Sequence, residues 1–74
     1  MTRPTAAQLR AARSMLGLTH EQAAHLASLN HATVRRAERG DPRLSATSLE
    51  RIIAVYAARG VVFIGNTGVE RKSA

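Results

Sequence analysis

The stretch from residue 19 to residue 40 constrains the fold most, because its sequence, THEQAAHLASLNHATVRRAERG, predicts two short helices joined by a tight turn. Thr19 and Gln22 have the spacing of a capping box, which starts the first helix. Asn30 can cap the second helix by accepting from the free N–H groups of its first turn. Gly40 can adopt the left-handed conformation that ends this helix.

Helices this short are not stable alone in water, so they must pack against each other and against the rest of the chain. Ala24 and Ala27 are small enough to let the two helices cross closely. Leu29 can fill the corner between them, and Val34 can pack the second helix against the first. The outer face of the second helix then carries His31, Ala32, Arg35 and Arg36. A projecting basic helix of this size fits the major groove of B-form DNA.

Residues 8–40 resemble the Cro/C1-type (XRE) helix-turn-helix family. The matching segments are L-R-x-A-R at 9–13, L-G-L-T at 16–19, Ala24, N-x-A-T-V-R-R at 30–36 and E-R-G at 38–40. The resemblance implies a mainly α, lambda-repressor-like domain of four helices. Ser28 departs from the family, which usually has glycine in the turn, and implies either a strained left-handed residue or a different turn. Ala23 and Ala37 stand where the family often has leucine, which implies a thinner core.

The resemblance also assigns roles in DNA binding. Base contacts are expected at the start of the helix over 31–38 and one turn further on, at Asn30, His31, Ala32, Arg35 and Arg36. Contacts with the DNA backbone are expected at Thr19, His20, Thr33, Arg39 and Arg43. For Arg36 the physical argument agrees, because its guanidinium matches O6 and N7 of guanine, although a phosphate contact or a solvated side chain is the alternative. Arg10 is either a phosphate contact or a solvated residue.

Arg13 and Glu38 match two family positions that form an ion pair between the first and third helices. Arg13 falls near the end of the first helix and Glu38 at the end of the third. The role carried over by the resemblance is structural, because such a pair fixes the angle of the third helix and does not touch DNA bases.

The rest of the chain predicts two further helices. A capping box formed by Thr5 and Gln8 starts the first helix of the chain, and another formed by Thr47 and Glu50 starts a helix over about 48–58. The apolar stripe of this last helix consists of Leu49, Ile52, Ile53 and Tyr56. Their i, i+3, i+4, i+7 spacing is typical of a helix that closes a core.

Residues 61–71 predict a short β-hairpin, because an apolar run is followed by the turn sequence G-N-T-G and a possible return strand. The run consists of Val61, Val62, Phe63 and Ile64. A strand with one wet face alternates polar and apolar residues, and this one does not, so both of its faces require cover. The helix over about 48–58 can cover one face, and we expect a second copy of the chain to cover the other. These four residues are therefore the expected dimer interface, unless the hairpin folds only onto its own helix over about 48–58.

Composition narrows the possible functions. The 74 residues fit one domain, 1–74, with a net charge of +6 and ten arginines among its eleven basic residues. Without cysteine there is no disulfide or thiolate site, and no histidine pair has metal spacing beside a carboxylate. No nucleophile elbow or glycine-rich phosphate loop occurs, so we expect neither an enzyme nor a cofactor. One Tyr and one Phe offer no stacking platform for RNA, and the longest apolar run is too short to span a membrane.

The sequence therefore predicts a cytoplasmic, sequence-specific regulator of transcription that binds double-stranded DNA. We expect a repressor that acts as a homodimer and places each third helix, over about 31–38, in a major groove. The alternative is an antitoxin-like interaction module whose main partner is another protein.

Overall fold

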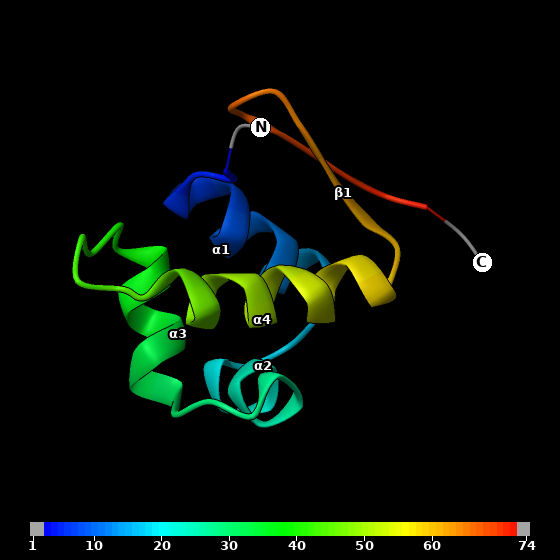
Figure 1. The fold of residues 1–74 in the computed structure, drawn as a ribbon. Helices are drawn as coiled ribbons and strands as arrows, with labels where there is room; N and C mark the ends of the chain where they lie inside the picture. Colours follow the sequence, from blue (N-terminus) through cyan, green and yellow to red (C-terminus); the bar gives the residue numbers. More distant parts are fainter. Residues whose placement is uncertain (1–2, 73–74) are drawn as a thin grey trace.

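Four helices and a C-terminal hairpin make up residues 3–72, the part of the chain that this computed structural model describes (Figure 1). Their bounds are α1 Ala6–Met15, α2 His20–Ala27, α3 His31–Glu38, α4 Ala46–Ala58, β1 Val61–Ile64 and β2 Gly68–Arg71. The predicted mainly α fold with a short hairpin is thus confirmed. None of the described helices has the length and apolar character needed to cross a membrane.

The first three helices begin where the sequence predicts, because each has a local side-chain cap. Thr5 Oγ1 accepts from Gln8 N at 3.1 Å, and Gln8 Oε1 accepts from Thr5 N at 2.9 Å. Thr19 and Gln22 form the same reciprocal pair at the start of α2, with distances of 3.0 and 2.9 Å. Asn30 Oδ1 accepts from the backbone N–H of residue 32 at 2.8 Å and so starts α3.

The predicted start of α4 is wrong by two residues. Ser45, not Thr47, is the cap, and its Oγ accepts from Ser48 N at 3.1 Å. Ser45 comes first after the loop, and a serine there can satisfy the first turn of a helix as well as a threonine can. Thr47 consequently lies inside α4 rather than before it.

The turn between α2 and α3 is made by a left-handed serine. Ser28 has φ 57° and ψ 44°, which decides between the two alternatives that the sequence left open. The turn is closed by backbone bonds from Ser28 N to His25 O at 3.2 Å and from Leu29 N to Ala24 O at 2.8 Å. A non-glycine residue in this conformation costs roughly 1–2 kcal/mol, which the packing of the two helices has to offset.

The buried side chains of α2 are small, and much of the large buried side-chain volume of the core comes from α4. The buried residues of α2 are all alanines: Ala23, Ala24 and Ala27. The small side chains bring α2 close to α3 and α4. The largest fully buried side chains include Tyr56 and Ile52 of α4 and Val34 of α3. Close contact with α2 therefore contributes to the orientation of α3, together with the burial of Val34.

The hairpin lies against α1 and α4 (Figure 1). β1 and β2 are antiparallel, with Val61 opposite Arg71 and Ile64 opposite Gly68. Val61 is buried in the core and Phe63 packs partly against it, whereas Val62 and Ile64 are 37% and 52% exposed. One face of β1, which carries Val61 and Phe63, is therefore covered by α4 and the rest of the core, so these two of the four predicted interface residues lie inside the chain. The other face, with Val62 and Ile64, is the exposed one.

The turn of the hairpin is tied to the start of α1. The side chain of Gln8 is buried, and its Nε2 donates to the carbonyl oxygens of Gly65 and Gly68, both at 3.0 Å. Thr5 Oγ1 donates to Asn66 O at 3.3 Å. The capping residues of α1 therefore also hold the hairpin in place.

Candidate nucleic-acid interface

The outer face of α3 carries exposed basic side chains. Arg35 and Arg36 lie on the helix and Arg39 directly follows it, and all three are exposed, as is His31 at its first position. None of these three arginines forms an ion pair with any residue between 3 and 72. Their charges therefore remain available to an anionic partner.

Four of the other predicted contact residues are partly used or partly covered by the fold itself. Asn30 uses its Oδ1 to cap α3 and has its amide N–H groups left for a base. Thr19 uses its Oγ1 to cap α2 and keeps its O–H donor. Ala32 and Thr33 are half-buried beside the exposed arginines. The predicted DNA contacts of all these residues stay predictions.

A polar cluster fixes the C-terminal end of α3. Glu38 is 5% exposed. Its Oε2 accepts from Arg13 Nε at 2.6 Å, and its Oε1 accepts from Arg13 NH2 at 3.1 Å. Arg13 NH1 also donates to Leu18 O at 3.0 Å. The hydrogen bond with Glu38 raises the pKa of Arg13 above its ordinary value, so the guanidinium stays charged. This pair therefore joins α1 to α3 at the point where α3 ends.

Two further cationic or titratable side chains meet the same glutamate. Arg10 NH1 donates to the backbone O of Glu38 at 2.8 Å, so Arg10 contributes to capping the end of α3 although the residue remains exposed. His20 Nε2 lies 3.2 Å from Glu38 Oε1. Sequence reasoning missed both contacts. The three-residue spacing of Arg10 and Arg13, which puts them on one face of α1, was the available signal.

Tyr56 lies behind this cluster in the core. Its side chain is 0% exposed, and its hydroxyl has no hydrogen-bond partner within the described residues. Burial, followed by the negative charge of Glu38, raises the pKa of Tyr56 to about 12. The phenol is therefore neutral at all physiological pH values, and the negative charge of the cluster stays on Glu38.

The predicted backbone contact Arg43 already has an anionic partner. Its Nε and NH2 donate to Asp41 Oδ1 and Oδ2 at 3.1 and 3.0 Å, although 83% of its side chain is exposed. The hydrogen bonds from Arg43 lower the pKa of Asp41 to about 2. Arg43 is therefore less available to phosphate than Arg39, whose charge has no such partner in the described part of the chain.

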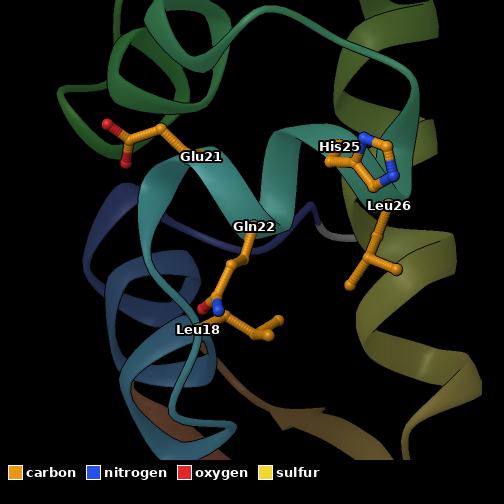
Figure 2. A pocket seen from close by; sticks show the side chains of 5 residues that line it. All are labelled: Leu18, Glu21, Gln22, His25 and Leu26. Atoms are coloured by element: carbon orange, nitrogen blue, oxygen red, sulfur yellow. The ribbon is translucent and has the colours of Figure 1, made fainter.

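A shallow hollow of about 390 Å³ lies on the flank of α2. Leu18, Glu21, Gln22, His25 and Leu26 line it. Figure 2 shows Leu18 and Gln22 on one side and Leu26 on the other, while Glu21 points away from them. The hollow contains none of the predicted base-contacting residues. Across residues 3–72 no group of three or more metal-ligating side chains comes together.

Residues 6–62 match the family model of a helix-turn-helix domain. The matched range spans α1 to α4 and the beginning of β1. No curated protein matches the chain.

Proposed function

Because this chain belongs to the helix-turn-helix domain family, we propose that it is a sequence-specific regulator of transcription that binds double-stranded DNA. Within that family we assign it to the Cro/C1 type, on the segments between residues 8 and 40 that resemble it. It acts as a repressor in the cytoplasm by occupying an operator.

The observation that carries this proposal is the contrast between the outer face of α3, which is basic and exposed, and its inner face, which is anchored to the rest of the domain. Arg35 and Arg36 are exposed on the outer face, and neither forms an ion pair within residues 3–72. The helix beneath them is held by Glu38, which bonds to α1 and α2. A basic helix in a fixed orientation can place an arginine on the edge of a guanine in the major groove.

Selection of bound sites from a pool of random duplexes tests this function. The proposed regulator enriches a short sequence, and a dimer enriches two half-sites related by two-fold symmetry, with centres about one DNA turn apart, ~34 Å. A pool that shows no enrichment after several rounds would contradict sequence-specific binding.

The dimer would form through the outer face of the hairpin. Val62 and Ile64 are the exposed apolar residues of β1, and a two-stranded sheet leaves strand edges that another chain can pair with. Two copies related by a two-fold axis would cover both features. Val61 and Phe63 would support this surface from inside the chain rather than contact the partner.

Sedimentation of hairpin variants at micromolar concentration tests the dimer. Val62→Glu and Ile64→Glu place a charge on the proposed interface and should give monomers with an intact fold. Thr67→Glu is the matched control, because Thr67 is exposed in the turn of the same hairpin and lies outside the apolar face. If both apolar-face variants remain dimers, the hairpin is not the interface.

The second candidate function is the antitoxin-like module whose main partner is another protein. The apolar hollow beside α2 favours it, because Leu26 there is 40% exposed. The two functions differ in the behaviour of the isolated chain. A regulator selects a duplex sequence by itself, whereas a chain that depends on a protein partner selects none until that partner is added.

A further inference from the structure

The contact between His20 and Glu38 fixes which nitrogen of the imidazole carries a hydrogen. Both carboxylate oxygens of Glu38 accept from Arg13, and Oε1 also lies 3.2 Å from His20 Nε2. A carboxylate in these contacts can only accept, so Nε2 must be the donor. In the neutral ring the lone pair is then on Nδ1, and protonation places a second N–H there.

Nδ1 is the free side of this imidazole. Among residues 3–72 it has no hydrogen-bond partner, and 26% of the His20 side chain is exposed. The ring therefore has one nitrogen committed to the end of α3 and one nitrogen open to a second partner. Protonation changes that open nitrogen from an acceptor into a charged donor.

The charged and titratable groups around His20 come from all the packed helices. Glu38 comes from α3 and Arg13 from α1. Tyr56 of α4 is within electrostatic range of both, and Glu21 follows His20 in α2. Of these side-chain types, only histidine ordinarily changes its charge between pH 5 and 8.

We propose that DNA binding by this chain is coupled to the protonation of His20. The inference rests on the proposed function and on the contact with the DNA backbone that the family resemblance implies for His20. A phosphate oxygen that approaches the neutral ring meets the lone pair of Nδ1, and the two repel each other. The same oxygen meets an N–H donor and a positive charge when the ring is protonated. Bound DNA thus favours the charged form.

The direction of the effect follows from this linkage. Because the complex holds the proton more readily than the free chain, affinity for DNA rises as the pH falls. Each proton taken up on binding changes the dissociation constant by up to about tenfold per pH unit. The effect is confined to the interval in which the free ring loses its proton and the bound ring keeps it.

The experiment measures the affinity of one selected duplex between about pH 5.5 and about pH 8.5 at constant ionic strength. Wild type is compared with His20→Gln, which keeps an N–H donor for Glu38 but cannot be protonated. His25→Gln is the matched control, because His25 lies on the same helix, is exposed, and lines the hollow of Figure 2 instead of the proposed interface. Wild type and His25→Gln should lose affinity in parallel as the pH rises, and His20→Gln should lose clearly less. His31 at the start of α3 is present in all three chains, so any contribution from it is common to all three profiles.

The other possible outcomes distinguish failure of the His20 coupling from failure of the proposed function. A flat profile for wild type, with duplex binding intact, overturns the coupling and leaves the proposed function standing. A slope in His20→Gln that is as steep as in wild type shows that the proton binds elsewhere and also overturns the coupling. Absence of duplex binding at every pH overturns the proposed function as well.

Nuclear magnetic resonance of the wild type keeps the test valid if His20→Gln fails to fold. At about pH 7 the addition of duplex should move the ring resonances of His20 toward those of a charged imidazole. The ring resonances of His25 should not move in this way. Resonances of His20 that keep their neutral position in the complex would overturn the proposal.

Discussion

The inner and outer faces of α3 carry different chemistry within eight residues. The inner face consists of Val34, Ala37 and Glu38, which are 1%, 3% and 5% exposed. The outer face carries Arg35 and Arg36, which are exposed. Because a helix separates its faces by the 3.6-residue period, one short segment can be anchored on one side and remain free on the other. Substitutions on the two faces should therefore have different signatures: the inner face controls unfolding, and the outer face controls the DNA affinity.

The largest expected effect is the salt dependence produced by the outer face. A dimer that makes ~6–10 phosphate contacts should lose on the order of 10³–10⁵ in affinity between about 50 and about 200 mM salt. Thermal unfolding should change much less over the same range, because the inner-face ion pair is buried and less screened. A titration of a selected duplex at several salt concentrations measures this. An affinity that does not change with salt concentration would contradict the proposal that the outer face binds phosphate electrostatically.

The second expected effect is the loss of the inner-face carboxylate. Glu38→Ala leaves Arg13 without its partner between packed helices and should lower the free energy of unfolding by ~3–5 kcal/mol. Glu50→Ala is the matched control, because Glu50 is exposed on α4, and should change it by less than about 0.5 kcal/mol. In urea denaturation, the Arg13→Ala, Glu38→Ala double variant should be less damaged than the sum of the single variants. Strict additivity would argue against energetic coupling of the pair.

The third expected effect belongs to the outer face and should leave folding intact. Arg36→Ala should cost ~1–3 kcal/mol of binding at one base pair and relax the preference there. Arg59→Ala serves as the control, because Arg59 is exposed at the end of α4 that points away from α3 (Figure 1). Binding to a library of single-base variants measures both. If Arg36→Ala weakens every sequence equally, Arg36 contacts the backbone and not a base.

A smaller effect is expected from Tyr56, behind the inner face. Because its pKa is raised from 10.0 to about 12, the unfolded chain loses its phenol proton first as the pH rises. The stabilising contribution is fully present below about pH 10 and is lost toward about pH 12. Tyr56→Phe should remove this alkaline loss and change the free energy of unfolding at neutral pH by less than about 1 kcal/mol, because the hydroxyl it removes has no partner in the described chain. Urea denaturation of wild type and Tyr56→Phe, at neutral pH and again between about pH 10 and about pH 12, measures both free energies of unfolding. A Tyr56→Phe chain that is much less stable at neutral pH would reveal a hydrogen bond to that hydroxyl.

The smallest expected effect concerns the exposed arginine–carboxylate pair, Arg43–Asp41, which differs in burial from Arg13–Glu38. Arg13–Glu38 is buried, whereas Arg43–Asp41 leaves 83% of the Arg43 side chain exposed. Asp41→Asn keeps an Oδ1 acceptor for the loop but frees the charge of Arg43. The salt dependence of DNA binding should steepen by up to about one unit of logarithmic slope per chain. An unchanged slope would show that Arg43 does not approach phosphate even when it is released.

Local features of the chain were predictable from sequence, and features that depend on helix crossing were not. The capping boxes of Thr5 and Thr19 involve residues three apart, so their spacing is visible in the sequence. The start of α4 was misplaced because Ser45 and Thr47 both offer a cap, and local sequence alone does not choose between them. His20 and Arg10 reach Glu38 only because α1, α2 and α3 cross at one point.

The hairpin illustrates the same limit. Four consecutive apolar residues in β1 show that the strand is apolar but not which face its own chain covers. The structure assigns the inner face to Val61 and Phe63, because the hairpin lies on α4 and α1. Gln8 was predicted only as part of a helix cap, and its second role emerges from its bonds to Gly65 and Gly68, far away in sequence.

Methylation interference tests the central claim, that the outer face of α3 contacts bases in the major groove, most directly. Guanine N7 lies in that groove, so methylating it blocks an arginine that bonds to it. In a selected operator, methylation of one guanine in each half-site should abolish binding of the wild type, and Arg36→Ala should be insensitive to methylation at that guanine. Binding that no N7 methyl group disturbs, or the same interference pattern in wild type and Arg36→Ala, would contradict the account.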